Sequence, residues 1–308
     1  ERQPAIHRVG ALSTPNLTSD KEQEMPSFET PQPIVLSIEL SQGMVHVIAS
    51  DRSDTVVAVT PSDPRRAADV EATRKTVVDL ANGTLSIRMP KPGGIAAPVI
   101  GWKRSGSIDV TVELPEGSSL RADTGVADFR CDGRLGNVDV RTGVGSVRVD
   151  QTGGLRVHSG LGRFAVEEAS GNAEIVTAGD MTIGAVAGDA EVKNLNGKTW
   201  IARVGGDVRV KSANGDVTIE DAGRNVTVKT ANGDIRLGQI ARGSTVIETA
   251  AGGLEIGIRE GTSAWIDANT RFGRIHNSLS SADDPGPSAE TVQVRARTAF
   301  GDVLITRA

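Results

Sequence analysis

The chain has 308 residues, enough for two average domains or for one elongated domain, and its formal net charge is −5. This acidic balance argues against general nucleic-acid binding, which needs a basic surface, and the single cysteine, Cys131, excludes an intrachain disulfide. Aromatic residues make up only 3% of the chain and tyrosine is absent, so we expect a thin core of valine, isoleucine, leucine and small residues.

The N-terminal residues 1–33 are polar and contain prolines, which predicts a disordered tail. They lack the apolar centre of a secretion signal, and no apolar run in the chain approaches the roughly 18 residues of a transmembrane helix. The chain as given is therefore expected to be cytoplasmic. Because it begins at Glu1 rather than at methionine, the alternative is a secreted or cell-surface protein whose leader was removed.

Residues 34–105 are predicted to form a β-rich cap followed by a loop. The strand-like runs "PIVLSIEL", "MVHVIAS", "DTVVAVT" and "GTLSIRMP" lack a regular spacing, and "SDPRRAADVEATRK" between them predicts one short helix. The stretch "KPGGIAAPVIGWKRSGS" is interpreted as a loop. A cap is expected here because a bare end strand would offer an open edge to other chains.

A repeat of about 18 residues organises residues 106–308. Each copy opens at a glycine, and such a sustained period is the signature of a solenoid. A last copy opens at Gly301, after an insertion at about residues 276–291. The marker glycines before it, spaced 17 to 21 residues apart, are Gly106, Gly125, Gly143, Gly160, Gly179, Gly197, Gly215, Gly233, Gly252 and Gly273.

Each copy contains two short alternating runs, such as Val208 and Val210 before Gly215 and Val217 and Ile219 after it. Period-two alternation turns one set of side chains inward. Strands that stack on their counterparts one copy away predict an all-β protein, a parallel β-solenoid (β-helix) of about ten rungs that lie ~4.8 Å apart. We expect glycines at corners that need positive φ, and a ladder of Ser and Thr hydroxyls bonded to the corner backbone. The pattern leaves open whether each rung has two sheets or three.

These repeats carry a family resemblance. The segments "SIDVTVELPEGSSLRADTG", "TGVGSVRVD", "SANGDVTI" and "TRFGRIHNSL…VRARTAFGDVLITRA" resemble a bacterial β-strand-repeat family of unknown function, often labelled putative adhesin, and their style is similar to actinobacterial members. The resemblance covers about residues 34–308. It implies a β-solenoid, no established catalytic residues, and a role in the cell envelope or in interaction.

Three lysines are candidates for an interaction surface. Lys193, Lys211 and Lys229 occupy the same outward position in consecutive copies, where like charges at one rung spacing repel each other. A polyanion could be what they bind. The alternative is a solvated face whose long side chains also discourage aggregation between sheets.

Trp200 and Trp265 also fall at outward positions and are further candidates for this surface. Exposed tryptophan anchors protein interfaces and binds sugars. The alternative is that either ring packs beneath a neighbouring segment of the chain.

No catalytic, metal-binding or cofactor-binding residues are predicted. The histidines lie far from Cys131 and from each other, without the spacing of a metal site. Aspartates after corner glycines, such as Asp216 and Asp234, suit turn hydrogen bonds better than calcium, because the nonapeptide pattern of calcium-binding rolls is missing. Glu174 and Glu191 are the one stacked acid pair, and neighbouring arginines favour a charge ladder over a catalytic dyad.

We therefore expect a non-catalytic structural or interaction protein, a rigid solenoid that presents a regular surface to a partner protein, to a cell-envelope polymer or to a second copy of itself. Head-to-tail self-association would need an open edge on the last copy, "TAFGDVLITRA". The alternatives are a carbohydrate-active β-helix enzyme and a polyanion-binding module that uses the lysines.

Overall fold

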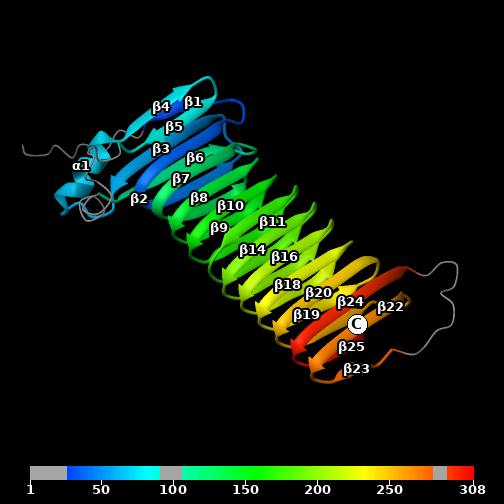
Figure 1. Ribbon diagram of the computed structural model, residues 1–308. Helices are drawn as coiled ribbons and strands as arrows, with labels where there is room; N and C mark the ends of the chain where they lie inside the picture. The colour runs from blue at the N-terminus through cyan, green and yellow to red at the C-terminus, as the bar shows by residue number, and fades with distance from the viewer. Residues whose placement is uncertain (1–25, 91–105, 280–289) are drawn as a thin grey trace, which may run out of the picture.

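A computed structural model describes residues 26–90, 106–279 and 290–308. In these ranges the chain forms an elongated rod of strands that lie side by side across the rod axis (Figure 1). The rod runs from the N-terminal strands and helix α1 at one end to β22–β25 at the other.

The middle of the rod consists of two stacks of parallel strands. The first stack contains β8 (Val138–Val144), β10 (Leu155–Leu161), β12 (Ala173–Thr177), β14 (Ala190–Asn196), β16 (Val208–Asn214), β18 (Val226–Asn232) and β20 (Gly243–Ala251). The second stack contains β9 (Val147–Thr152), β11 (Phe164–Ala169), β13 (Met181–Val186), β15 (Thr199–Val204), β17 (Val217–Ala222), β19 (Ile235–Ile240) and β21 (Leu254–Ile258). Each strand pairs in parallel with the strands one turn before and after it, so Val210 lies between Val192 and Val228. The predicted parallel β-solenoid is confirmed, with two strands per turn.

The core lies between the two stacks and follows from the alternation of side chains. Val192, Val210 and Val228 on the first stack are fully buried, as are Ile183 and Ile201 on the second. They belong to one continuous cluster of buried residues along the rod. Because the core is only two aliphatic layers deep, each rung depends on the rungs above and below for most of its burial.

The corners repeat polar contacts from one turn to the next. Asp216 accepts a hydrogen bond from the N–H of Asp234 (3.2 Å), and Asp234 accepts one from the N–H of Gly253 (2.7 Å), so these aspartates serve turn chemistry, as the sequence indicated. The side chains of Asn196, Asn214 and Asn232 form a second ladder, with N···O distances of 2.9 Å.

The predicted hydroxyl ladder is present in part. Thr249 and Thr298 donate to the carbonyl oxygens of Gly233 (3.2 Å) and Gly252 (3.0 Å) in the adjacent rungs. The buried hydroxyls of Ser159, Thr177 and Ser212 have no hydrogen-bond partner among the described residues, so the ladder is interrupted there.

Residues 34–50, expected in the cap, pair as a full rung. β2 (Val35–Ser50) pairs in parallel with β7 (Ser119–Arg134) along nearly its whole length. Its other side pairs in parallel with β5 (Thr84–Arg88) and then β6 (Ile108–Pro115), which together make the outermost parallel rung. The chain therefore inserts its first long strand between two rungs that come later in sequence. An 18-residue spacing cannot reveal such a rung, because its neighbours are distant in the chain.

The expected cap covers this outermost rung. β3 (Asp54–Pro61) pairs antiparallel with β6, and β4 (Val77–Ala81) pairs antiparallel with β5. The predicted short helix is confirmed as α1 (Ala67–Lys75), beside β3. No helix in the described ranges has the length and apolar character needed to cross a membrane.

The predicted disordered tail is wrong in its last residues. β1 (Ser27–Glu29) pairs antiparallel with β3, and the hydroxyl of the buried Thr30 lies 2.7 Å from that of Thr55. The edge of β3 gives this short segment a partner that composition alone could not indicate. Residues 1–25 and the predicted loop at 91–105 lie outside the described residues.

The C-terminal end also departs from sequence order. β24 (Thr291–Phe300) and β25 (Val303–Arg307) lie between the rung of β20 and β21 and the rung of β22 (Ser263–Phe272) and β23 (Ile275–Asn277). The condition for head-to-tail association, an open edge on "TAFGDVLITRA", is therefore not met, because this segment lies in the penultimate rung and β22 is the edge strand. Of the predicted insertion, residues 280–289 lie outside the described residues.

Candidate interaction surface

The three predicted lysines lie together on the outer face of the first stack. Lys193, Lys211 and Lys229 pair in register on β14, β16 and β18. Lys193 Nζ lies 2.9 Å from Glu191 Oε1, and Lys229 Nζ lies 2.8 Å from Glu248 Oε2. Lys211 forms no ion pair among the described residues. The stripe is therefore largely neutralised by its own neighbours, which weakens its attraction for a polyanion.

A groove with a volume of about 1030 Å³ runs beside this stripe, along the starts of the first-stack strands from β7 to β18. Its polar lining spans seven successive turns, a length of ~29 Å at the usual strand spacing, and Val35 of the neighbouring strand β2 lines one end. One wall is the column of first outward residues, which carries both signs of charge: Arg121, Asp139, Arg156, Glu174, Glu191 and Arg209. The other wall is formed by the polar residues of the corner that precedes each first-stack strand: Asn137, Asn172, Asp189, Asp207 and Asn225.

Hydrogen bonds between rungs hold the corner wall in place. Asp189 Oδ1 accepts from the N–H of Asp207 (2.8 Å), and Asp207 Oδ1 accepts from the N–H and the Nδ2 of Asn225 (3.3 and 3.1 Å). Asn172 Oδ1 accepts in the same way from the N–H of Asp189 (3.0 Å). One oxygen of each carboxylate is used for structure, which leaves the other free to accept a hydrogen bond from a bound molecule.

The acid pair of the groove is engaged by cations. Glu174 and Glu191 are register partners on β12 and β14. Glu174 Oε2 accepts a hydrogen bond from Arg156 Nε (3.0 Å), and the hydrogen bond from Lys193 holds the pKa of Glu191 below its usual range. A general acid in glycoside hydrolysis needs a raised pKa. Glu191 is instead placed to remain ionised, and both carboxylates belong to a ladder of alternating charges.

The structure does not bring the two predicted tryptophans to the lysines. Trp200 lies on β15, on the outer face of the second stack, where its Nε1 donates to Glu220 Oε1 (3.4 Å). Trp265 lies on the end strand β22 and is 59% exposed. The predicted surface is thus divided among three places, and a binding role for these five residues stays a prediction.

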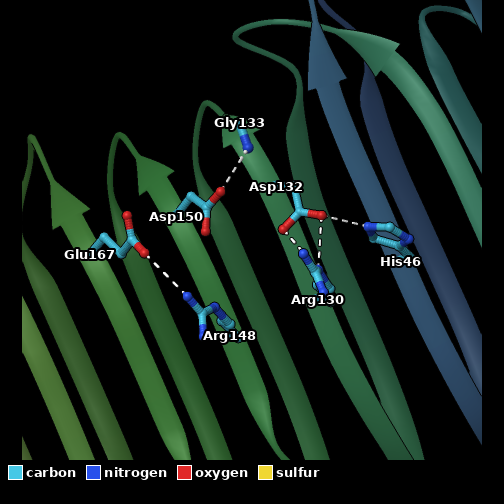
Figure 2. Close-up of polar contacts among 7 residues, drawn as sticks. All are labelled: His46, Arg130, Asp132, Gly133, Arg148, Asp150 and Glu167. Atoms are coloured by element: carbon cyan, nitrogen blue, oxygen red, sulfur yellow. Dashed lines mark hydrogen bonds and ion pairs between the residues drawn. The ribbon is translucent and has the colours of Figure 1, made fainter.

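A second polar cluster, which sequence reasoning missed, ties the inserted strand β2 to the second stack (Figure 2). Asp132 accepts hydrogen bonds from Arg130 Nε (3.0 and 2.9 Å), and its Oδ2 lies 2.6 Å from His46 Nε2. In the next rungs, Arg148 Nη2 lies 3.3 Å from Glu167 Oε1. His46 lies in a strand predicted to belong to the cap and is 86 residues from Asp132. The 18-residue repeat therefore could not predict that the two residues are neighbours.

We expect the stability contribution of Asp132 to depend on pH. Partial burial raises the pKa of this carboxyl, but hydrogen bonds from His46 and Arg130 outweigh it, so the pKa lies below its usual value near 3.8. A lowered folded-state pKa stabilises the fold above the unfolded-state pKa and loses this effect as pH falls through the folded-state value. Asp132→Asn should therefore lower the urea midpoint at pH 7 and lower it less at pH 3. Equal losses at both pH values, or an equal pH dependence for the exposed control Asp123→Asn, would contradict this.

Cys131 points into the core beside this cluster and is fully buried. Burial raises the pKa of its thiol to about 12. The thiol is therefore kept protonated and out of reach of solvent, as expected of a small core residue. In the described ranges, no three His, Cys, Asp or Glu side chains are grouped closely enough to hold a metal ion.

Comparisons with solved structures give remote neighbours. A putative cell adhesion protein from Clostridium sporogenes is 11% identical, covers 92% of this chain and 99% of its own, and has a TM-score of 0.21. A putative lipid binding protein from Parabacteroides distasonis is 10% identical (92% and 96% covered, TM-score 0.36), and a putative adhesin from Parabacteroides merdae is 8% identical (93% and 97% covered, TM-score 0.36). No curated protein matches the chain.

The match to a family model is decisive, because it spans almost all of the described rod. The model of the family described as Toastrack DUF4097 matches residues 35–306, from the inserted strand β2 to β25. This agrees with the predicted resemblance to a β-strand-repeat family of unknown function, while the actinobacterial style stays a prediction. The chain belongs to the Toastrack DUF4097 family.

Proposed function

We propose that the protein is a non-catalytic interaction protein whose rigid rod binds a hydroxyl-rich cell-envelope polysaccharide along the groove of the first stack. The observation that carries this proposal is the groove itself, which presents fixed polar side chains on seven successive turns. An extended polymer can contact such a surface at every rung, so that many weak contacts add up.

The groove walls are suited to hydroxyl groups rather than to one sign of charge. Guanidinium, carboxylate and amide groups alternate along them, as in Arg156, Glu174 and Asn172. Hydrogen bonds between rungs already hold these side chains, so that binding costs little additional side-chain entropy. A polyanion has less to gain, because Lys193 and Lys229 already pair with carboxylates.

The geometry of the acid pair supports a non-catalytic role. Glu174 and Glu191 are bonded to Arg156 and Lys193, and the pKa of Glu191 is lowered rather than raised. Glycoside hydrolysis requires one carboxyl that is protonated near neutral pH. We infer that the polymer is held and not cleaved.

A matched pair of variants tests the groove. Arg156→Gln/Glu174→Gln removes a cross-rung ion pair from the groove, and Arg236→Gln/Glu255→Gln removes the same kind of pair from the second stack, on the opposite outer face. We expect the groove variant to bind a soluble neutral polysaccharide such as hydroxyethylcellulose about tenfold more weakly, a loss of about 1.4 kcal/mol. The control variant should bind it like the unmodified protein.

Affinity electrophoresis in gels that contain the neutral polysaccharide, teichoic acid or heparin measures these differences. Retention on heparin that disappears with salt and in Lys193→Glu/Lys211→Glu/Lys229→Glu would support polyanion binding instead. Equal weakening by the groove and control variants, or release of shortened sugar chains, would contradict the proposal.

A further inference from the structure

The two ends of the rod are finished differently. At the N-terminal end, β3 and β4 cover the outermost parallel rung, and its inward residues Leu85 and Ile87 are 0% exposed. At the C-terminal end, no described residue covers β22, and its inward Ile266 is partly exposed. Val294, the partner of Ile266 one rung further in, is 0% exposed. The end rung therefore has a core-forming side that lacks its next layer.

The outer side of β22 also offers main-chain groups for pairing. The N–H of Ser263 points toward the preceding rung, because it donates to the carbonyl oxygen of Glu290 (2.8 Å). In a strand, the N–H and C=O of successive residues point to alternate sides. Those of Ala264, Ile266 and Ala268 therefore point to the free edge. The strand contains no proline to block this edge, which is a common protection of exposed strands.

We propose that this edge is a dimerisation surface, on which β22 pairs antiparallel with β22 of a second copy about a two-fold axis. A second copy fits because each edge offers the same donors and acceptors, which an isologous pair satisfies reciprocally. At the opposite end, β3 and β4 pair antiparallel with the outermost parallel rung, so a second copy cannot continue the stack of parallel rungs there. The same cap prevents head-to-tail stacking of copies as one continuous series of parallel rungs.

Side-chain complementarity selects the register of this pair. Inward residues must face inward residues, and two such registers give the longest overlap of β22 with its copy. The register centred on Asp267 places two like charges opposite each other, which is destabilising. The register centred on Ala268 instead places Trp265 opposite Arg271 and Asp267 opposite Asn269. In this register the Trp265 ring can contact the Arg271 guanidinium, and the Asp267 carboxylate can accept a hydrogen bond from the Asn269 amide. Ala268 then faces Ala268 of the second copy on the two-fold axis.

The size of the surface suits a reversible dimer. A ten-residue strand is ~34 Å long, and two packed sheets with their outer side chains are ~20 Å thick, so the rung end covers roughly 700 Å². This is close to the ~800 Å² per partner of ordinary stable interfaces. The two-fold axis would place both first stacks on one side of a doubled rod. If the groove binds as proposed above, the dimer would then be bivalent.

A cysteine on the axis tests the pairing in the full-length chain. Ala268→Cys should form a disulfide-linked dimer under mild oxidation, because residue 268 faces its own copy within the Cα separation that disulfides span. Thr270→Cys, which would face Ile266, and Thr227→Cys, midway along the rod, should not. Cys131 does not interfere, since it is fully buried.

Sedimentation velocity over a range of protein concentrations gives a second, polymer-free readout. We expect a monomer–dimer equilibrium that Trp265→Ala/Arg271→Ala weakens at least tenfold and that Trp200→Ala leaves unchanged. The protein could instead remain a monomer at all concentrations while the amides of Ala264, Ile266 and Ala268 resist hydrogen exchange. That result would mean that another part of the chain covers the edge, and it would overturn the proposal. A dimer without the Ala268→Cys cross-link would also overturn it. Neither result depends on whether the groove binds a polysaccharide.

Discussion

Gly215→Ala is expected to destabilise the protein by about 3 kcal/mol or more, because two costs coincide at this corner. The φ of Gly215 is +126°, a region that residues with a Cβ rarely adopt. A Cβ at this position would also lie 2.1 Å from the carbonyl oxygen of Gly197 in the adjacent rung. The corner can relieve this clash only by moving away from the rung beneath it, which breaks main-chain hydrogen bonds.

Gly261→Ala is the matched control for this prediction. Its φ is +77°, but a Cβ there meets no atom within 4 Å, so only the cost of the backbone conformation remains, about 1 kcal/mol. Urea unfolding followed by circular dichroism measures both variants. Similar losses for the two variants would show that rung-to-rung contact does not limit the corner.

Val303→Asp is expected to destabilise the fold much more than Ile275→Asp. Val303 lies on the inserted strand β25 and is 0% exposed, whereas its register partner Ile275 lies on the end strand β23 and is 47% exposed. A carboxylate at Val303 would be buried without a partner, at a cost of at least about 4 kcal/mol. The same change at Ile275 should cost less than about 1 kcal/mol.

This comparison depends on the order of the last two rungs. If the rungs followed the order of the sequence, Ile275 would lie in the inner rung and Val303 at the end, and the two effects would be reversed. Hydrogen exchange of peptides from β21 and β25 should show the loss in Val303→Asp, because each rung of a solenoid is stabilised by its neighbours. Greater damage from Ile275→Asp would contradict the inserted rung.

The middle of the fold was predictable because its signals are local and repeated. The alternation around Gly215 and Gly233 sets both the inward face and the register, and this placed Lys193, Lys211 and Lys229 in one column. Trp200 follows its marker glycine, Gly197, whereas the lysines precede theirs. This position places Trp200 on the second strand of its turn. This spacing is enough to separate Trp200 from the column of lysines.

The order of the end rungs was not predictable, because the repeated pattern that reveals the middle of the fold is the same in each end rung. The runs around Ile266 and Val294 have the same alternation, so either can follow Val246 in the stack, and only long-range packing decides between them. The ion partner of Lys229 does follow from the pattern, because Glu248 occupies the same column position in the next rung. The pairing of Lys193 with Glu191 on its own strand instead depends on side-chain conformation. The groove depends on the depth of the corners, which side-chain periodicity does not encode.

Distances along one column of the first stack test the central claim, that the chain is a stack of parallel rungs whose last two are exchanged in order. Spin labels at Asp139 and, in turn, Thr227, Arg295 and Asp267 can be read by double electron–electron resonance. In a stack with this order, we expect separations of ~24, ~34 and ~38 Å from residue 139, so that residue 295 lies nearer to it than residue 267 does. Distances that do not rise from rung to rung would contradict the solenoid, and a shorter distance to residue 267 than to residue 295 would contradict the inserted rung.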